Sequence, residues 1–600
     1  MVFCIGLVMA IFIGKLFFIQ VLTNDFAGKA NRNVFKYKVI TPPRGNIYNR
    51  YSEIYVSSSP IFDMLITPRE LRIADTTALY TYLDMSPEEV RRGIRKAAEY
   101  SSYKESILAR NIEPRVYGPL QEQLWNSGGI SFQGMNKRYY RYPVGANILG
   151  YVSEVDSSEI RAGAAENVRY YLGDLIGKSG LERSYEDLLR GQQGVKVVLK
   201  DVHNREVGSY ANGAKDRPAV KGTDLMLGLD TELQAFGEAL MANKKGSIVA
   251  IEPRTGEILA FVSSPTYNPN ALTGRELRKN WRRLRSDTLN PLFNRPLMAT
   301  YPPGSIFKLA IALAALDEGI ITPDTRYGCG GGFSRNRGKP GCRMHPHPLP
   351  LDGAIRYSCN SYFSATYMDL LHSNKYDSIY QAFDAWHKHM ADLGIGQILH
   401  VDLPYEQSGL LPSTAMYDNP KRYYGHNRWS ATTIISNAIG QGEILMTPMQ
   451  MANLVAIIAN RGEYFPPHFV KATRANESET WVARSYERKF TDIARHHYEV
   501  VADAMEQVVA SGTARRAFIE NIVVCGKTGT VQNPHGQDHA VFVGFAPKEN
   551  PKIAIAVIIE NAGGGGSWAA PTASLMIEKF ISRKIVYKQF EYQRIMNAKF

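Results

Sequence analysis

The chain has 600 residues, of which 44% are hydrophobic and 21% are charged. This length exceeds what one compact core holds, so two or more domains are expected, and the composition excludes a largely disordered chain. Lys and Arg outnumber Asp and Glu by 70 to 57, but the cations are scattered and form no nucleic-acid motif, so nucleic acid is not expected as a partner.

The first segment predicts a single membrane anchor. Residues 1–22 are almost wholly apolar, Lys15 is their only charge, and their length is close to that needed to cross a bilayer. A cleaved signal peptide would have a shorter apolar run and then a small-residue cleavage site. Residues 23–25, Thr-Asn-Asp, provide no such site, so a retained anchor is the better interpretation.

Short strands and helices are predicted for the N-terminal half. A strand is expected at Val34–Val39, followed by a turn-forming segment at Thr41–Arg50. A helical pattern covers Thr76–Leu108, in which residues 86–89, Ser-Pro-Glu-Glu, are typical of a helix N-terminus. Gly180–Leu189 has the pattern of an amphipathic helix. Further strands are predicted at Tyr139–Val155, Gly194–Gly208 and Thr223–Leu229.

A second domain is predicted to begin near Asp230. Thr231–Asn243 has a helical pattern, and the apolar runs Gly246–Pro253 and Glu257–Val262 are typical of a β-hairpin. The remaining predicted elements are a helix, three strands and a last helix: Ser305–Gly319, Ile522–Cys525, Ala540–Phe545, Ile553–Ile559 and Ala573–Lys584. Strands on both sides of a helical middle favour an α+β fold, with an antiparallel sheet flanked by helices.

Ser305 and Lys308 form the first of three short motifs that carry chemistry. Residues three apart on a helix lie on one face, so the Lys308 amine can act as a base for the Ser305 hydroxyl. The helix N-terminus also favours a developing alkoxide. Ser101 and Lys104 have the same spacing in a segment interpreted as a solvent-exposed helix, so this spacing alone is not specific.

Two further motifs follow in order along the chain. Residues 358–360, Ser-Cys-Asn, combine a hydroxyl that can relay a proton with an amide that can orient a substrate. Alone, this segment would be interpreted as an ordinary polar turn. Residues 527–530, Lys-Thr-Gly-Thr, follow an apolar strand, and their lysine and threonine suit a carboxylate ligand. The three motifs in this order are those of serine β-lactamases and penicillin-binding proteins.

Other segments match the motifs of one of these families along nearly the whole chain. They are Pro43–Arg50, in which Asn49 replaces the usual Asp, and Gly177–Glu182, Leu189–Gly191, Gly246–Pro253, Tyr301–Gly304, Gly440–Gly442 and Met446–Pro448. With them the chain resembles a class B penicillin-binding protein, most of all the elongation-type penicillin-binding protein 2. The resemblance implies an anchor at 1–22, an elongated pedestal domain with a head insertion at 23–225, and a transpeptidase domain at 226–590.

The resemblance also implies an activity, that of a D,D-transpeptidase cross-linking peptidoglycan stem peptides. Ser305 would attack the D-Ala–D-Ala carbonyl and release D-Ala, with Lys308 as base and Ser358 as proton relay. An amine of a neighbouring stem peptide would then take the acyl group, β-lactams would acylate the same serine, and catalysis would need no cofactor. The remaining site residues would hold the substrate: Asn360 its amide, Lys527 and Thr528 its terminal carboxylate, and the N–H groups of Ser305 and Thr530 its oxyanion.

A group of cysteine and histidine residues predicts a structural zinc site. Cys329, Cys342, His345 and His347 lie in one segment, and Cys359 follows inside the second motif. Thiolates with an imidazole suit tetrahedral zinc, although the spacing is not that of a standard finger and the choice between the two histidines stays open. The side chain at 359 should point away from its two neighbours, toward this group.

The resemblance supports zinc, because some elongation-type penicillin-binding proteins 2 bind it near this motif through Asp, His and Cys. This chain has Cys329 and Cys342 where Asp ligands would align. A Cys329–Cys342 disulfide, natural in an exported domain, and free thiols are the alternatives.

Several other functions stay open. A serine β-lactamase would hydrolyse its acyl-enzyme, and a β-lactam sensor or scaffold would keep the fold for binding, but the anchored N-terminal region and the intact motifs disfavour both. A division-type enzyme is the alternative within the family. The Cys/His segment and the N-terminal motifs favour the elongation type, which implies a SEDS-family glycosyltransferase and other elongation-complex proteins as partners. The chain would then lie in the inner membrane with its catalytic domain on the periplasmic side.

Overall fold

The computed structural model describes residues 2–18, 35–72, 77–165, 170–200, 206–534 and 536–600. Helix α1 (Val2–Phe17) covers most of the predicted anchor at residues 1–22. Residue 1 and residues 19–22 of that prediction lie outside the described residues. Among the helices in the described ranges, none has both the length and the apolar character that crossing a bilayer requires.

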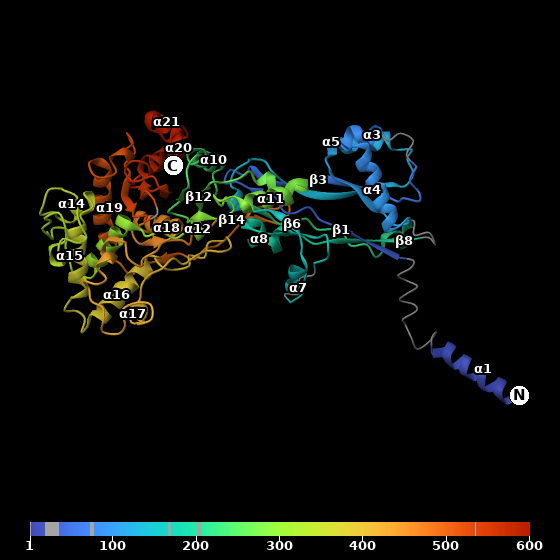
Figure 1. Cartoon of the computed structure of the whole chain (residues 1–600), viewed down its shortest axis with the longest axis horizontal. Coiled ribbons are helices and arrows are strands. Elements are labelled where there is room, and N and C mark those ends of the chain that lie inside the picture. The colour runs from blue at the N-terminus through green and yellow to red at the C-terminus, as the bar shows by residue number, and fades with distance from the viewer. Residues whose placement is uncertain (1, 19–34, 73–76, 166–169, 201–205, 535) are drawn as a thin grey trace.

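Two larger sheets and the short pair β6 (Val152–Glu154) and β7 (Leu175–Gly177) build the described N-terminal half, which lies toward one end of an elongated molecule (Figure 1). One of the larger sheets has the strand order β1-β8-β9, and the other has the order β15-β14-β10-β2-β3-β4, with β5 also paired to β3. Their strands are β1 (Phe35–Ile40), β2 (Ile47–Tyr48), β3 (Ile54–Ile66), β4 (Ser106–Ile112), β5 (Ile130–Tyr140), β8 (Gly194–Lys200), β9 (Glu206–Ser209), β10 (Asp224–Leu227), β14 (Val470–Arg474) and β15 (Val482–Ala483). The strands predicted near 34–39 and 223–229 are therefore confirmed as β1 and β10.

A separate small core forms a head on this half of the molecule. Helices α3 (Thr77–Leu83), α4 (Pro87–Tyr100) and α5 (Pro114–Gln123) pack beside β3, β4 and β5 around buried residues such as Met64 and Leu120. At the start of α4 the predicted N-terminal signal is confirmed, because Ser86 and Glu89 exchange side-chain and backbone hydrogen bonds. The prediction of helix up to Leu108 is wrong, since Ser106–Leu108 already belong to β4.

A buried ion network joins the segments Pro43–Arg50 and Gly177–Glu182. Glu182 is fully buried, and its carboxylate lies 2.7 Å from Arg44 Nη2 and 2.6 Å from Arg138 Nη2. Arg44 also pairs with Glu186 at 2.8 Å. Burial alone would raise the pKa of Glu182, but the charges of Arg138 and Arg44 lower it, so the carboxylate stays ionised. These contacts fix segments that lie about 140 residues apart in the sequence.

Replacing Glu182 by Gln is expected to destabilise the chain by about 3–5 kcal/mol, because two buried guanidinium groups lose the charge that compensates them. Thermal or denaturant unfolding of the purified chain measures the effect. The matched control is Glu154→Gln, whose partner Arg110 is exposed and which should cost less than about 1 kcal/mol. Equal losses in the two variants would contradict the structural role given to the buried network.

A five-stranded antiparallel sheet forms the centre of the C-terminal half, as predicted. Its order is β12-β11-β19-β18-β17, and every neighbouring pair is antiparallel. The strands are β11 (Gly246–Ile251), β12 (Ile258–Ser264), β17 (Cys525–Val531), β18 (His539–Ala546) and β19 (Ile553–Ile559). Every residue of β11 and β19 is buried, which requires cover on both faces of the sheet and explains their continuous apolar sequences.

Helices pack against this sheet in separate groups. Helices α10 (Thr231–Leu240) and α20 (Ala569–Ser582) contact one another and the sheet, and α18 (Pro448–Ala459) and α19 (Arg495–Ala510) pack on it elsewhere. Helix α13 (Lys308–Asp317) lies between α15 (Asn360–Leu371) and α19, and its residues Lys308 to Leu316 are all buried. The predicted α+β class is therefore confirmed.

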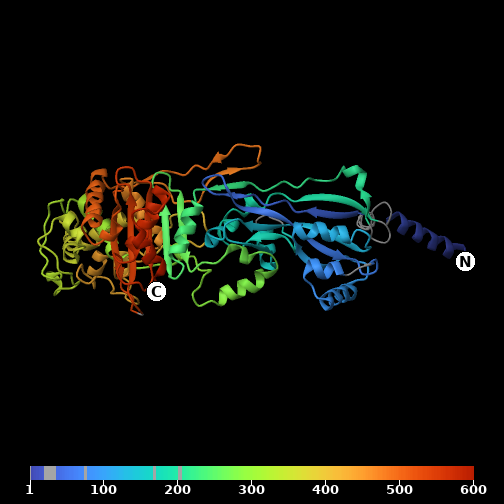
Figure 2. The same ribbon diagram turned by 90° about the horizontal axis from the view of Figure 1, so that it is seen from above.

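A further strand boundary and one strand pairing differ from what the sequence predicts. The strand expected at Ile522–Cys525 begins only at Cys525, because Ile519 and Ile522 pair across a tight turn in which Asn521 has a φ of +64°. The Lys-Thr-Gly-Thr motif thus lies on the edge strand β17 itself. The second difference is that β14 and β15, from the C-terminal half, pair with the N-terminal sheet and extend along it (Figure 2).

Candidate active site and metal cluster

The three motifs come together at one cavity of about 730 Å³. Ser305 lies on the short 3-10 turn η5 (Gly304–Phe307) immediately before α13, and β17 packs directly on this turn. Gly304 makes the approach possible: its φ is +57°, and a side chain there would come within 3.1 Å of the Thr530 carbonyl oxygen. Ser305, Ser358, Asn360, Thr528 and Thr530 all line the cavity.

Lys308 is fully buried at the start of α13, three residues after Ser305. Its amine donates to the Asn360 Oδ1 atom at 2.6 Å, to the Ser358 carbonyl oxygen at 2.8 Å and to Ser358 Oγ at 3.1 Å. Burial lowers the pKa of Lys308 to about 8, because desolvation disfavours the charged ammonium. About a tenth of this amine is therefore neutral at pH 7, far more than for an ordinary lysine, as a base for the nearby Ser305 requires.

Lys527, on β17, contacts Ser358 as Lys308 does. Its Nζ donates to Ser358 Oγ at 2.9 Å, so this hydroxyl lies between two lysine amines. The pKa of Lys527 is well below its ordinary value because the side chain is buried and because Lys308 is a neighbouring cation. Ser358 itself has a φ of +57°, in the left-handed region that is uncommon for non-glycine residues.

Thr513 is a site residue that the sequence analysis missed. Its hydroxyl lies 2.7 Å from that of Thr528, and both side chains line the cavity. Thr513 lies between α19 and η8 (Arg515–Ala517) and belongs to none of the three motifs, so no signal in the sequence marked it.

Three arginines on the cavity wall were also missed. They are Arg343, Arg515 and Arg516, and all three are exposed.

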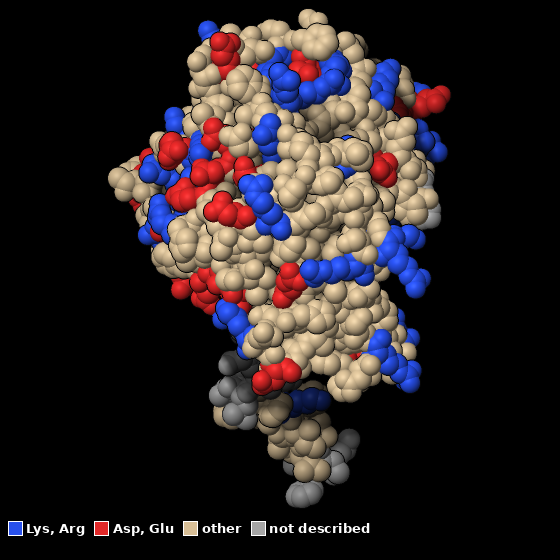
Figure 3. Space-filling view, turned by 90° about the vertical axis from the view of Figure 1, so that its left-hand side faces the viewer, with Lys and Arg blue, Asp and Glu red and all other residues tan. Residues whose placement is uncertain are grey.

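Figure 3 looks onto the end of the molecule formed by α14 (Leu351–Arg356) and α15, where Lys and Arg gather near the top of the view and Asp and Glu mainly on its left.

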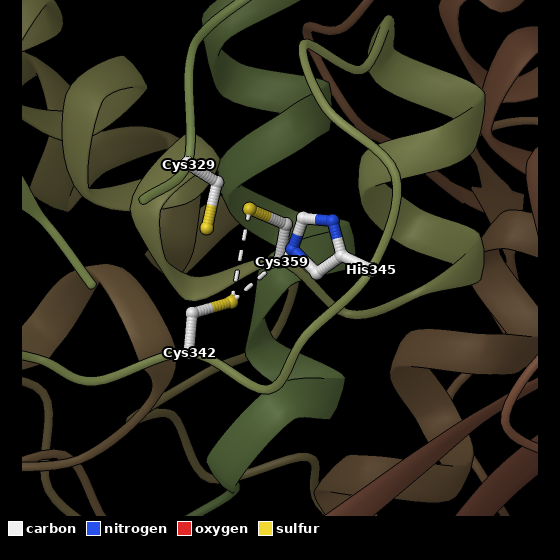
Figure 4. A group of neighbouring side chains, drawn as sticks. All are labelled: Cys329, Cys342, His345 and Cys359. Carbon is white, nitrogen blue, oxygen red and sulfur yellow. Dashed lines mark hydrogen bonds between the residues drawn. The ribbon is translucent and has the colours of Figure 1, made fainter. Parts of the chain in front are cut away.

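Four of the five predicted metal ligands form one cluster (Figure 4). The ligand atoms of Cys329, Cys342, His345 and Cys359 all lie within 4.8 Å of one another. His347, the alternative histidine, is exposed and lies outside this group. All three cysteines are free in the structure, so it contains no Cys329–Cys342 disulfide.

The donor set suits a metal ion. Cys342 Sγ and Cys359 Sγ lie 3.9 Å apart and share a hydrogen bond, which lowers the pKa of Cys342 to about 4 and raises the pKa of Cys359. His345 Nε2 lies 3.3 Å from Cys342 Sγ. Three sulfurs and one imidazole nitrogen at such separations fit the tetrahedral set of a structural zinc site, so the cluster can hold a metal.

The metal cluster and the catalytic motif share one short segment. As predicted, the Cys359 side chain points away from its neighbours: Ser358 and Asn360 contact Lys308, whereas Cys359 Sγ lies in the cluster. Asn360 N donates to Cys342 Sγ at 3.3 Å, and Asn360 Nδ2 donates to the Gly341 carbonyl oxygen at 2.6 Å. The loop carrying Cys342 is therefore attached directly to a residue of the active site.

The domain pattern and the relatives of the chain agree with this site. Residues 246–578 match the penicillin-binding protein transpeptidase domain, and residues 39–227 match the penicillin-binding protein dimerisation domain. The chain is 31% identical to the peptidoglycan D,D-transpeptidase MrdA of Acinetobacter baumannii, over 94% of this chain and 85% of that protein.

Two solved structures are similar over nearly the full length. One is Pseudomonas aeruginosa PBP2 in complex with WCK 5153, with 26% identity, a TM-score of 0.64 and coverage of 91% of this chain and 97% of that chain. The other, described as a peptidoglycan synthase complex that coordinates polymerization and crosslinking, has 25% identity, a TM-score of 0.73 and coverage of 97% and 98%. The chain therefore belongs to the penicillin-binding protein transpeptidase family, as a class B member of the elongation type.

Proposed function

We propose that this chain cross-links peptidoglycan stem peptides as a D,D-transpeptidase, through an acyl-enzyme on Ser305. The observation that carries the proposal is Lys308, a fully buried amine of lowered pKa one turn after Ser305 and held by Ser358 and Asn360. In its neutral form this amine takes the proton of the Ser305 hydroxyl as the oxygen attacks the D-Ala–D-Ala carbonyl. Collapse of the tetrahedral intermediate releases D-Ala and leaves the acyl-enzyme.

Other residues hold the donor and move its proton. Ser358 Oγ, between the two lysine amines, relays the proton to the leaving D-Ala nitrogen, and Asn360 binds the substrate amide. Lys527 and Thr528 hold the terminal carboxylate, with Thr513 as a second hydroxyl beside Thr528. The backbone N–H groups of Ser305 and Thr530 form the oxyanion hole, which supplies electrostatic stabilisation where charge develops.

The second half-reaction distinguishes this activity from its rivals. An amine of a neighbouring stem peptide attacks the acyl-enzyme, which forms the cross-link and restores Ser305. A serine β-lactamase would use water at this step, and a β-lactam sensor would stop at the acyl-enzyme. β-Lactams acylate Ser305 as mimics of D-Ala–D-Ala and block both half-reactions.

The rest of the chain positions this domain at the membrane. We assign residues 1–22 to a single-pass inner-membrane anchor, 23–225 to the pedestal with its head insertion, and 226–590 to the transpeptidase domain on the periplasmic side. One structural relative coordinates polymerization and crosslinking within a synthase complex, and the same pairing is proposed here with a SEDS-family glycosyltransferase as the polymerising partner. The proposed role is cell elongation and maintenance of rod shape.

The Cys/His cluster is assigned a structural zinc ion. Cys329, Cys342, His345 and Cys359 would hold it, and the ion would fix the loop around Cys342 against Asn360. Zinc neutralises thiolates and crosslinks the segments that carry them, so it supplies stability to this wall of the active site. The acyl transfer itself involves only the residues named above.

The proposed function is tested with stem peptides that end in D-Ala–D-Ala, supplied with a second stem peptide as amine acceptor. The wild-type chain should release one D-Ala for each cross-linked product, and Ser305→Ala should lower both by at least about 10⁴-fold. Mass spectrometry separates the cross-linked peptide from the hydrolysed one. D-Ala release that yields only hydrolysed peptide would instead favour an enzyme that transfers the acyl group to water. No release of D-Ala would favour a β-lactam sensor.

A further inference from the structure

Three exposed arginines face the catalytic cavity without a partner of opposite charge. Arg343 comes from the loop that carries the metal ligands, and Arg515 and Arg516 come from η8. Within the described part of the chain, none of the three forms a salt bridge, whereas Arg335 nearby pairs with Asp369 at 2.7 Å. A guanidinium is charged at every physiological pH, so three permanent cations line one cavity.

The backbone beside Arg343 is held firmly in place. Cys342 N donates to the Gly331 carbonyl oxygen at 2.8 Å, and Asn360 Nδ2 donates to the Gly341 carbonyl oxygen at 2.6 Å. The preceding residue, Cys342, and His345 two residues further on both belong to the metal cluster. Arg343 is therefore carried by a fixed loop, which reduces the conformational entropy lost when its side chain binds a ligand.

The acidic residue of the cavity does not balance these charges. Asp538 lines the same cavity, and its Oδ1 accepts a hydrogen bond from Asn533 N at 3.4 Å. The arginines outnumber it among the lining residues, so the cavity mouth favours an anionic ligand. The terminal carboxylate of D-Ala–D-Ala already has the buried Lys527 and the Thr528 hydroxyl, which leaves the exposed arginines for a different group of the donor.

We propose that Arg343, Arg515 and Arg516 select donor peptides in which the residue before D-Ala–D-Ala ends in a free side-chain carboxylate. The inference rests on the proposed function and names its substrate class more narrowly. Arginine binds carboxylates through paired, charge-assisted hydrogen bonds. A donor that carries a carboxamide there loses the charge attraction and leaves the guanidinium groups without their partner, so it is the poorer substrate.

The test uses two synthetic donors that differ only at this group, one a carboxylate and the other its carboxamide. D-Ala release by the full chain gives kcat/KM for each donor, and the readout is the ratio of the two. The wild-type ratio should be about 10 in favour of the carboxylate, since exposed charge pairs contribute up to about fivefold each. The ratio should fall as salt is added, because exposed charges are screened.

Substituted chains locate the selectivity. The triple variant Arg343→Gln, Arg515→Gln, Arg516→Gln should bring the ratio to about 1, and each single variant should lower it by about two- to threefold. Because the ratio is taken within each variant, a general loss of activity cancels. The matched control, Arg335→Gln, removes a paired arginine of the same segment outside the cavity and should keep the wild-type ratio.

Two further outcomes separate the claims. A wild-type ratio near 1, or a high ratio that persists in the triple variant, would overturn the selectivity while leaving the transpeptidase activity in place. Release of D-Ala from neither donor by the wild-type chain, together with no penicillin adduct on Ser305, would overturn the proposed function and this inference with it.

Discussion

Replacing Lys308 by Met is expected to lower the rate of Ser305 acylation by about 10³-fold, the scale of a lost general base. Methionine keeps a flexible apolar stem in the buried space but cannot accept the serine proton. Stopped-flow measurement of acylation by a fluorescent penicillin gives this rate directly.

Lys244 provides the matched control. It is also a buried lysine whose pKa is lowered to about 8 by burial, but its amine donates to the Leu240 carbonyl oxygen and lies outside the catalytic cavity. Lys244→Met should therefore acylate at the wild-type rate. Similar losses in the two variants, or a Lys308→Met chain that acylates within tenfold of wild type, would remove Lys308 from the role of base.

The pH dependence of the acylation rate follows from the Lys308 amine. The pKa of Lys308 is lowered to about 8, so the neutral, proton-accepting amine gains population as the pH rises through that value. Wild-type acylation should therefore increase between pH 6 and about pH 8 and level off above it, and this rise should be absent in Lys308→Met. An acylation rate that falls over the same interval would contradict a neutral lysine base.

The second large effect is expected at the metal cluster. His345→Ala should abolish stoichiometric zinc binding, because it removes one of four ligands, whereas His347→Ala should leave it unchanged because that side chain lies outside the cluster. Removing a residue that only hydrogen-bonds a metal ligand lowers metal affinity by about 10- to 100-fold, so removing a ligand itself should lower zinc affinity by at least about 100-fold. At saturating zinc, each 100-fold is ~2.7 kcal/mol of stability.

Elemental analysis of the purified variants and thermal unfolding with and without a chelator test this prediction. Chelation should destabilise the wild type and His347→Ala but change His345→Ala little. Zinc retained by His345→Ala and lost by His347→Ala would reverse the assignment of the histidine. Zinc-free wild-type chain with a Cys329–Cys342 disulfide after purification under oxidising conditions would favour the structural disulfide that the sequence had left open.

The gathering of the three motifs at one cavity could be predicted because each motif is local and combines residue types with one chemistry. Ser305 lies on η5 and Lys308 begins α13, so the two are three residues apart in the sequence. The direction of the Cys359 side chain followed from its position between two residues that face the other way. The α+β class followed from strands on both sides of a helical middle. These features depend on neighbours in the sequence, so the sequence alone contains them.

The features that the sequence did not predict depend on contacts between distant segments. Thr513 reaches Thr528 from a different element, and the three cavity arginines belong to no motif. The choice of His345 over His347 depends on the path of a loop rich in proline and glycine, which no periodicity describes. Pairing of β14 with β10 across some 250 residues likewise has no local signal.

The central claim is that Ser305 forms the acyl-enzyme, and intact-protein mass spectrometry tests it most directly. The wild-type chain is incubated with a penicillin, and Ser305→Ala is treated in the same way. A persistent gain of one drug mass in the wild type, absent from Ser305→Ala, is the predicted result. A folded wild-type chain that shows no adduct, or an adduct that survives in Ser305→Ala, would contradict the account.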